Sequence, residues 1–215
     1  MSNKIIKILV VDDHKLVRTG IIGLLSTAND MQVVAEASNG EEAINLARKH
    51  SPDVILMDLQ MPGMGGLEAT RKLIRTIPDI KVLVVTICDS DVFPARVLEE
   101  KAAGYITKNC SQKELIEAIR KVQAGQRYIS PEIAQKLVLK RAVTEGSPFD
   151  MLSEREFQVM IMITKGQKVP QIASVLHLST KTVNTYRYRI FEKLGIKNDV
   201  ELTLLALRHD IIDKN

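Results

Sequence analysis

The chain of 215 residues has no tryptophan, only two cysteines and few aromatic residues, which make up 4% of it. Cys88 and Cys110 are too few for the disulfide framework of a small secreted domain and do not form a metal-binding pattern. No apolar run approaches the roughly 20 residues that a membrane-spanning helix needs. The first residues, MSNKIIKILVVDD, lack a small-residue cleavage site, so we expect no signal peptide. These absences predict a reduced, cytoplasmic protein without membrane insertion.

Positive charge is in excess only in the C-terminal part of the chain, which has a net charge of +4 overall. Residues 1–125 hold 16 Lys and Arg against 16 Asp and Glu, whereas residues 126–215 hold 14 against 10. An asymmetry of this kind indicates a C-terminal part that faces nucleic acid, although on its own it also fits an ordinary solvated surface.

The N-terminal part alternates between two hydrophobic periods. Apolar runs typical of buried strands occupy residues 5–11, 31–37, 53–58, 81–86 and 104–107. Amphipathic segments lie between them, and the later ones are residues 65–77, 90–102 and 111–125. In the first expected helix, one face can be shared by Leu16, Thr19, Gly20, Gly23 and Leu24. The alternation predicts an α/β domain at residues 1–125, a five-stranded doubly wound parallel sheet in the order 2-1-3-4-5 with helices on both faces.

The rest of the chain has a different character. Residues 126–148 predict a linker with a short helix at 131–141, because TEGSP at 144–148 has loop composition. From Leu152 onward no strand pattern occurs, and helices are expected at residues 153–166, 170–177, 179–195 and 199–210. Ser153 and Glu156 match a capping box. Residues 149–215 therefore predict a small all-α, four-helix domain.

Carboxylates gather where the predicted strands end. Asp12 and Asp13 follow the first strand and Asp58 ends the third, while Thr86 ends the fourth and Lys108 follows the fifth. In a doubly wound sheet, ligands bind beyond the carboxyl ends of the strands at the point where strand order reverses. Carboxylates this close cannot all stay ionised without a cation, and hard oxygen ligands suit Mg²⁺. Each residue alone could be a helix cap or a surface group, but the five together predict a magnesium-assisted phosphoryl site.

The motifs VVDDH, DVILMDLQMPGMGG, VLVVT and GYITK occur in that order within residues 5–125. They resemble the receiver domain of bacterial two-component response regulators. The resemblance implies that a histidine kinase phosphorylates Asp58, that Lys108 contacts the phosphoryl group, and that Thr86 binds one of its oxygens while Tyr105 follows inward as a switch. It also implies a Mg²⁺ site formed by Asp12, Asp13, Asp58 and the backbone carbonyl of Gln60.

Enzyme classes with related folds or motifs fit the sequence less well. The chain has neither the Ser/Thr/Gly-rich phosphate loop of a flavodoxin after its first strand nor a GxxxxGK[ST] nucleotide loop. A haloacid-dehalogenase-type phosphatase would need Asp-x-Asp, but Asp12 and Asp13 are adjacent. We therefore expect no enzyme beyond a receiver's own phosphoryl transfer and dephosphorylation. One departure from many receivers is Asn109 in place of proline after Lys108, which puts that loop's geometry in doubt.

Residues 179–195 predict a basic helix anchored by an apolar stripe. Its cations, set against the single acid Glu192, are Lys181, Arg187, Arg189 and Lys193. At helical spacing the apolar side holds Val183, Ile190 and Leu194, and a polar side holds Asn184, Thr185 and Tyr188. Because a short helix and a tight turn precede it, the segment reads as the second helix of a helix-turn-helix.

The segments LSEREFQVM, QIASVL, LSTKTVNTYRYRIFEKLG and VELTLLA resemble the LuxR-type DNA-binding domain. Together with the receiver they make the chain similar to the NarL/FixJ family of response regulators, and the basic helix is most similar to that of the GacA/UvrY/LetA group. The resemblance implies that bases are read by Asn184, Thr185 and Tyr188. It implies phosphate contacts from Lys181, Arg187 and Lys193.

We therefore expect a transcription factor that is controlled by phosphorylation. The expected partners are a sensor histidine kinase or phosphotransfer domain, promoter DNA, RNA polymerase and, when phosphorylated, a second copy of the chain. GacA-like targets would include genes of small regulatory RNAs. The alternative is a phosphorylation-independent interaction module or DNA-binding regulator with a vestigial acidic site.

Two routes of activation remain open from the sequence, dimerisation and unmasking of the recognition helix. Residues 199–210 offer a possible pairing face made of Val200, Leu204 and Leu207, although these side chains could equally form the domain's own core. Dimerisation is favoured, because the linker at 126–148 is long enough to tether the two domains loosely.

Overall fold

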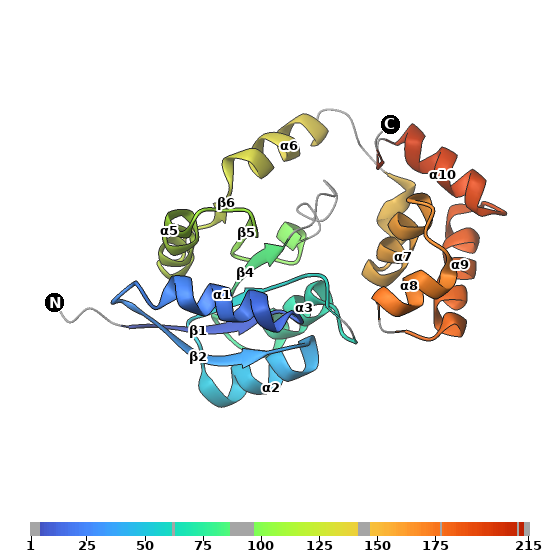
Figure 1. The fold of residues 1–215 in the computed structure, drawn as a ribbon. Coiled ribbons are helices and arrows are strands. Elements are labelled where there is room, and N and C mark those ends of the chain that lie inside the picture. The colour runs from blue at the N-terminus through green and yellow to red at the C-terminus, as the bar shows by residue number, and fades with distance from the viewer. Residues whose placement is uncertain are drawn as a thin grey trace. The chain divides into compact units, whose positions relative to one another are not determined.

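The computed structural model describes residues 5–61, 63–86, 97–141, 147–176, 178–209 and 211–212. The chain divides into two compact units, Met1–Val138 and Leu139–Asn215 (Figure 1). The first unit is a sheet covered by helices, and the second consists of short helices.

The first unit is built on a parallel sheet in the order β2-β1-β3-β4-β5-β6. Its strands are β1 Ile6–Val11, β2 Met31–Ala37, β3 Val54–Met57, β4 Lys81–Thr86, β5 Gly104–Thr107 and β6 Tyr128–Ile129. The five predicted strands and their order are confirmed, but the sheet has six strands and not five. β6 pairs in parallel with β5, and the backbone of Tyr128 approaches Gly104 so closely that an added Cβ there would lie 2.5 Å from the Tyr128 carbonyl oxygen.

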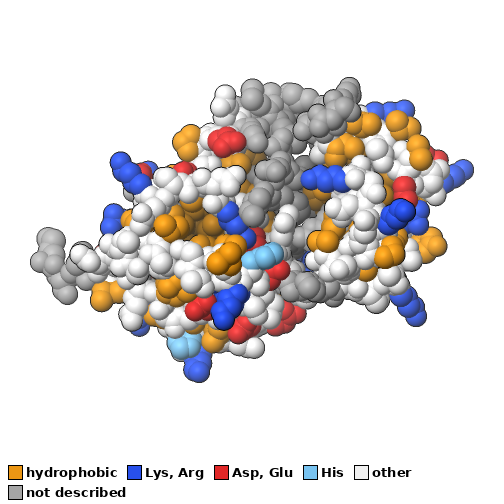
Figure 2. Space-filling view, in the orientation of Figure 1, with side chains coloured by type: hydrophobic (Ala, Val, Ile, Leu, Met, Phe, Trp, Pro, Cys, Tyr) orange, Lys and Arg blue, Asp and Glu red, His pale blue; other side chains and the backbone are white. Residues whose placement is uncertain are grey.

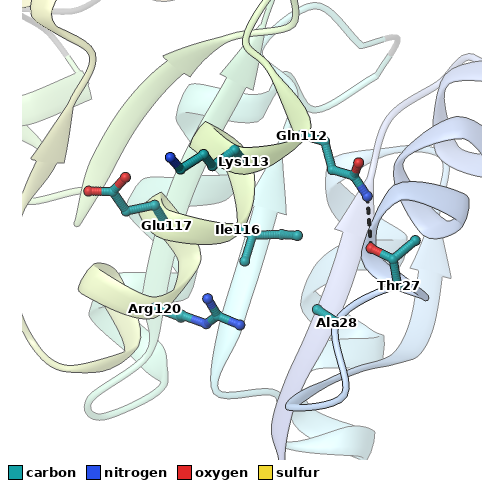
Figure 3. A pocket seen from close by; sticks show the side chains of 7 residues that line it. All are labelled: Thr27, Ala28, Gln112, Lys113, Ile116, Glu117 and Arg120. Carbon is teal, nitrogen blue, oxygen red and sulfur yellow. Dashed lines mark hydrogen bonds between the residues drawn. The ribbon is translucent and has the colours of Figure 1, made fainter.

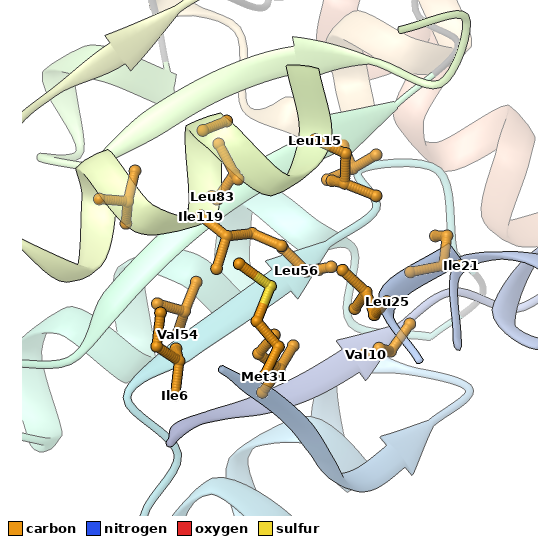
Figure 4. Close-up of a cluster of buried hydrophobic side chains, with 14 of the residues drawn as sticks. Ile6, Val10, Ile21, Leu25, Met31, Val54, Leu56, Leu83, Leu115 and Ile119 are labelled. Carbon is orange, nitrogen blue, oxygen red and sulfur yellow. The ribbon is translucent and has the colours of Figure 1, made fainter. Parts of the chain in front are cut away.

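Successive strand residues point to opposite faces of the sheet, and each face packs against its own helices. On one face, β-strand residues such as Val10 and Leu56 pack against α1 Lys15–Leu25 and α5 Gln112–Gln123 (Figure 4). On the other face, Leu9 and Met57 belong to a cluster shared with α2 Gly40–His50 and α3 Gly66–Thr76. The predicted doubly wound arrangement is therefore confirmed.

The face of α1 that we expected to be shared by leucines and small residues is the solvent face. Leu16 is 85% exposed, and Leu24 is also exposed, whereas Ile21 and Leu25 are buried in the core. The spacing of four residues between Ile21 and Leu25 sets the buried stripe, with Val17 packed partly against the same cluster.

The helix expected at residues 90–102 falls largely outside the described residues. Within the part that is described, residues 97–99 are helical. The helix expected at 111–125 is confirmed as α5. Its N-cap residue Ser111 accepts a hydrogen bond from the Glu114 N–H, and Gly125 follows its end with φ +82°. A Cβ is disfavoured at such a positive φ, so Gly125 suits the end of this helix.

The regular elements in the described part of the second unit are all helices, and the predicted helices are confirmed. Its elements are the 3₁₀ helix η1 Pro148–Met151, α7 Glu154–Thr164, α8 Val169–Val175, α9 Thr180–Leu194 and α10 Asp199–Arg208. The helix expected at 131–141 is α6 Pro131–Arg141. The fully buried side chains of this unit include Phe149, Phe157, Met160, Ile172, Val183, Ile190 and Leu202.

Polar caps determine where the helices of this unit begin and end. Ser153 and Glu156 form the predicted capping box of α7, and Ser179 caps α9 by accepting from the Thr182 N–H. Gly195, with φ +65°, terminates α9. None of the helices in the described ranges is long and apolar enough to cross a membrane.

Candidate functional sites

A buried acidic site lies at the carboxyl ends of β1, β3 and β5. The Nζ atom of Lys108 lies 2.7 Å from Oδ2 of Asp58 and 2.5 Å from Oδ2 of Asp12. Asp12 is 1% exposed and Asp58 is 3% exposed. The sequence prediction that these three groups converge is therefore matched by the geometry.

Strand register explains why they meet. Val11 of β1 pairs with Met57 of β3, so the next residues, Asp12 and Asp58, emerge side by side. The Asp58 N–H donates to the Val11 carbonyl at 2.9 Å, which continues the ladder past the last paired residues. In the same way the Lys108 N–H donates to the Thr86 carbonyl at 2.9 Å and holds the end of β5 against β4.

The electrostatics of the site follow from burial and from the closeness of like charges. Burial raises the pKa of Asp58, Lys108 lowers it in part, and the neighbouring Asp12 raises it again. Burial alone would lower the pKa of Lys108, but Asp58 and Asp12 outweigh it and raise that pKa, so Lys108 stays an ammonium. One ammonium faces two buried carboxylates, with Asp13 as a third acid alongside, so the donor set suits a further cation.

Asp13 lies at the more exposed side of this site. Its Oδ1 is 2.8 Å from Nδ1 of His14, and the His14 N–H donates to Oδ1 of Asp12 at 2.8 Å. Ligand atoms of Asp12, Asp13 and His14 all lie within 4.8 Å of one another. The two carboxylates offer the hard oxygen donors that Mg²⁺ prefers, whereas the His14 ring offers a nitrogen.

The remaining predicted receiver residues lie in or next to the strands that end at this edge of the sheet. Thr86 and Tyr105 are both fully buried, and Tyr105 lies in β5 opposite Val84 of β4. The N–H of Gln60 donates to Oδ1 of Asp58 at 3.3 Å. The structure thus brings Gln60 to Asp58 through its N–H, and the metal-ligand role of its carbonyl stays a prediction.

Two residues that sequence reasoning missed shape the site. A Cβ built on Gly66 would overlap the carbonyl oxygen of Asp58, so only glycine lets α3 begin this close to the acid. Arg18 of α1 donates from Nη1 to the Asp12 carbonyl at 2.6 Å and also pairs with Glu36 at 3.3 Å. The glycine pair in MPGMGG was a visible signal for the first, whereas no local pattern pointed to Arg18.

A surface pocket lies between the C-terminal end of α1 and α5 (Figure 3). Gln112 closes one side of it by donating to the Thr27 hydroxyl at 2.8 Å. Its lining residues are Thr27, Ala28, Gln112, Lys113, Ile116, Glu117 and Arg120, and none of them belongs to the acidic site.

In the second unit, α9 has the two-sided character that its sequence predicts. Val183 and Ile190 are completely buried. Tyr188 is 68% exposed, Thr185 and Lys181 are also exposed, and Asn184 is half-buried. The groups expected to read DNA are therefore presented by a helix whose apolar side is fixed in the core.

The other two cations expected to contact phosphate are engaged within the unit. Arg187 forms a bidentate ion pair with Asp199, at 2.7 and 2.8 Å. Lys193 lies 2.6 Å from Oε2 of Glu156. The prediction that Arg187 and Lys193 contact phosphate is not tested by these contacts, but both charges already have partners.

Comparison with known proteins assigns both units to families. Residues 8–120 match the family described as "Response regulator receiver domain", and residues 150–206 match "Bacterial regulatory proteins, luxR family". The chain therefore belongs to the LuxR-type response regulators, transcription regulators with a receiver and a DNA-binding helix-turn-helix domain, and is not a conventional enzyme.

Within this class the chain is GacA/UvrY-like. It is 59% identical to the response regulator GacA of Pseudomonas syringae pv. syringae over 97% of this chain and 98% of that protein. It is 51% identical to the response regulator UvrY of Escherichia coli K12 over 96% and 95% of the two chains. It also resembles RcsB of Salmonella enterica serovar Typhimurium, solved bound to the promoter rprA in the presence of the phosphomimetic BeF3⁻ (TM-score 0.64, 26% identity, 94% of this chain and 98% of that chain).

Proposed function

We propose that a sensor histidine kinase, or a phosphotransfer domain, transfers a phosphoryl group to Asp58 and that promoter binding responds. The observation that carries this is the buried Lys108 ammonium, which touches both Asp58 and Asp12 at the carboxyl edge of the sheet. An oxygen of Asp58 would attack the phosphorus, and Lys108 is already positioned to neutralise charge on the transferred group. Thr86 would bind a phosphoryl oxygen through its hydroxyl, and Tyr105 would act as the coupled switch.

Mg²⁺ would be held by Asp12, Asp13, Asp58 and the backbone carbonyl of Gln60. When bound, this ion supplies charge neutralisation for phosphoryl transfer. The chain's own residues orient the Asp58 carboxylate. Lys108 keeps Asp58 oriented, and the Gln60 N–H bonds the Asp58 oxygen that Lys108 leaves free.

We propose domain limits of 1–125 for the receiver, 126–148 for the linker and 149–215 for the DNA-binding domain. Base edges would be read by Asn184, Thr185 and Tyr188, with Lys181 on phosphate. The likeness to RcsB bound to promoter DNA supports this use of the domain. We also propose a cytoplasmic regulator that has RNA polymerase as a further partner and GacA-like targets that include genes of small regulatory RNAs, in line with the 59% identity to GacA.

We propose that the phosphorylated form is a homodimer. Val200 is 68% exposed and Leu204 is 51% exposed on α10, whereas Leu202 and Ala206 of the same helix are buried in its own unit. Leu207, the third residue of the apolar face predicted from the sequence, is half-buried, so two of the three side chains are exposed. Hydrophobic side chains are visible among charged ones on the face shown in Figure 2.

Intact-mass spectrometry after incubation with acetyl phosphate and Mg²⁺ tests the phosphoacceptor. The wild type should gain one phosphoryl group, Asp58→Asn should gain none, and the control Asp53→Asn should behave as the wild type. Asp53 is an acid near the opposite end of the same strand, where it accepts from the Lys7 N–H. A phosphoryl gain by Asp58→Asn at the wild-type rate would refute Asp58 as the phosphoacceptor. A wild type that gains no phosphoryl group would favour the alternative, a phosphorylation-independent regulator with a vestigial site.

A further inference from the structure

The recognition helix α9 is tied to the start of α10 by a two-pronged ion pair. Nε of Arg187 donates to Oδ1 of Asp199 at 2.7 Å, and Nη2 donates to Oδ2 at 2.8 Å. The parallel pair of bonds uses the guanidinium fork that would otherwise grip a phosphate. The same guanidinium carbon lies 5.2 Å from the ring centre of Phe191, which further fixes its position.

A second ion pair ties the other end of α9 to the start of α7. Lys193 donates to Oε2 of Glu156 at 2.6 Å and to the Met151 carbonyl at 3.1 Å. Glu156 is 3% exposed and also accepts from the Ser153 N–H at 2.7 Å as part of the capping box. Burial would raise the pKa of Glu156, but its bonds from Lys193 and Ser153 outweigh burial and lower it, so the carboxylate is ionised.

The other two cations of α9 do not form such ion pairs among the described residues. Lys181 and Arg189 are exposed, and neither has an acidic partner among the residues that the structure describes. The helix thus has two cations available to a polyanion and two whose charge is balanced inside the domain.

We propose that Arg187 and Lys193 are positioning residues that lock the recognition helix to α10 and α7, and that Asp199 and Glu156 withhold these two charges from DNA phosphate. The inference rests on the proposed use of α9 to read DNA. Phosphate contacts strengthen binding to every sequence alike, whereas base contacts distinguish sequences. Two acids that never touch DNA therefore support selectivity, by aiming the helix and by limiting non-specific attraction.

The salt dependence of DNA affinity distinguishes a cation that is ion-paired within the domain from one that contacts a phosphate. Binding of the full chain is measured across a KCl series by fluorescence anisotropy, on a duplex enriched by the wild type from a random-sequence pool and on a shuffled duplex of the same composition. The control Lys181→Ala should make the plot of log K against log salt shallower by about 0.9 on both duplexes, because one phosphate contact is lost.

The proposal predicts a different pattern for the residues of the two ion pairs. Arg187→Gln and Lys193→Gln should weaken binding to the enriched duplex at least fivefold without changing the salt slope. Asp199→Asn should instead steepen the slope on the shuffled duplex by about 0.9, because it frees one cation. Glu156→Gln should do the same and keeps the capping-box side chain, since glutamine serves that role as well. A merely structural role for the acids would weaken binding without steepening the slope.

A charge-swap variant separates loss of the ion pair from misfolding of a single variant. Arg187→Asp combined with Asp199→Arg should recover more of the preference for the enriched duplex than either single change, because it restores the pair between the same two helices. The proposal is overturned if Arg187→Gln flattens the slope as Lys181→Ala does, if Asp199→Asn leaves it unchanged, or if the swap recovers nothing. If the wild type does not prefer the enriched duplex at all, DNA reading itself fails, while the slopes on the shuffled duplex still decide whether the cations are ion-paired within the domain.

Discussion

At the scale of single residues, the acidic site is governed by charge balance. Lys108 is shared between Asp12 and Asp58, so neither carboxylate has a cation of its own. Burial is the largest cause of the raised pKa of Asp58, and the closeness of Asp12 adds to it. The excess of buried negative charge destabilises the folded state, and binding of a cation or removal of one negative charge would relieve this cost.

The first prediction concerns stability without metal. Because the pKa of Asp58 is raised on folding, the native state binds this proton more tightly than the unfolded chain. The free energy of unfolding therefore falls as pH rises from the ordinary value of 3.8 through the raised pKa. Asp58→Asn removes this charge and should be more stable than the wild type at neutral pH by about 1 kcal/mol, with the advantage vanishing on acidification. Urea unfolding in EDTA over a pH series measures it, and an equal or lower stability at neutral pH would contradict the charge account.

The second prediction concerns Gly66, which does not carry any chemistry. Gly66→Ala would force its Cβ into the Asp58 carbonyl and displace the acid. Misplacement of a reacting group by about 1 Å can cost up to roughly 100-fold, so phosphorylation by acetyl phosphate should slow by about tenfold or more. The control is Gly23→Ala, since a Cβ at Gly23 meets nothing within 4 Å. Equal phosphorylation rates of the two variants would show that Gly66 does not position Asp58.

The residue-level predictions from sequence succeeded where strand ends alone decide the geometry. Asp12, Asp58 and Lys108 meet because parallel strands place their carboxyl ends at one edge. The partners of Arg187 and Lys193 could not be predicted in this way. Asp199 and Glu156 come from other helices, and their approach to α9 depends on tertiary packing that helical spacing within one segment does not contain.

At the scale of secondary structure, segments with a clear hydrophobic pattern were predicted well, whereas the sixth strand and the buried face of α1 were not. The five apolar runs became β1 to β5, whereas β6 has only two residues and too little length to show a period. In α1 the leucines suggested one stripe, but Ile21 and Leu25 form the buried one. Hydrophobic type alone does not identify the core face of a helix that also exposes Leu16 and Leu24.

The exposed glycines of α1 give a prediction at this scale. Gly20 and Gly23 are exposed, and an added Cβ at either meets nothing within 4 Å. Glycine in a helix interior costs up to about 1 kcal/mol relative to alanine. Gly23→Ala should therefore raise the free energy of unfolding of the first unit by about 0.5–1 kcal/mol in urea denaturation. A loss of stability would mean that the backbone at this position is not ordinary helix.

At the scale of the whole molecule, the proposed function requires the acidic site of one unit to influence DNA binding by the other. The two units have separate cores, so a change at Asp58 must act through a surface, a partner or both. The exposed apolar side chains of α10 are the clearest candidate for contact with a second chain. This favours the dimerisation route over unmasking.

Leu204→Ser tests that route. Loss of an apolar side chain from a dimer contact typically costs about 1–2 kcal/mol or more, so the variant should dimerise at least fivefold more weakly after phosphorylation. Met151→Ser is the matched control, because Met151 is also exposed, at 54%, but lies in η1. Analytical ultracentrifugation of the phosphorylated proteins gives the dimerisation constants. If Leu204→Ser dimerises as strongly as Met151→Ser, this face of α10 is not the contact.

The central claim is that phosphorylation of Asp58 controls DNA binding by the whole chain. Its most direct test is the affinity for the enriched duplex at fixed salt, with and without acetyl phosphate and Mg²⁺, for the wild type and for Asp58→Asn. Dimerisation through phosphorylation predicts that the phosphodonor raises wild-type affinity at least tenfold and leaves Asp58→Asn unchanged. The same affinity for the wild type with and without the phosphodonor, despite a confirmed phosphoryl mass on Asp58, would contradict the account.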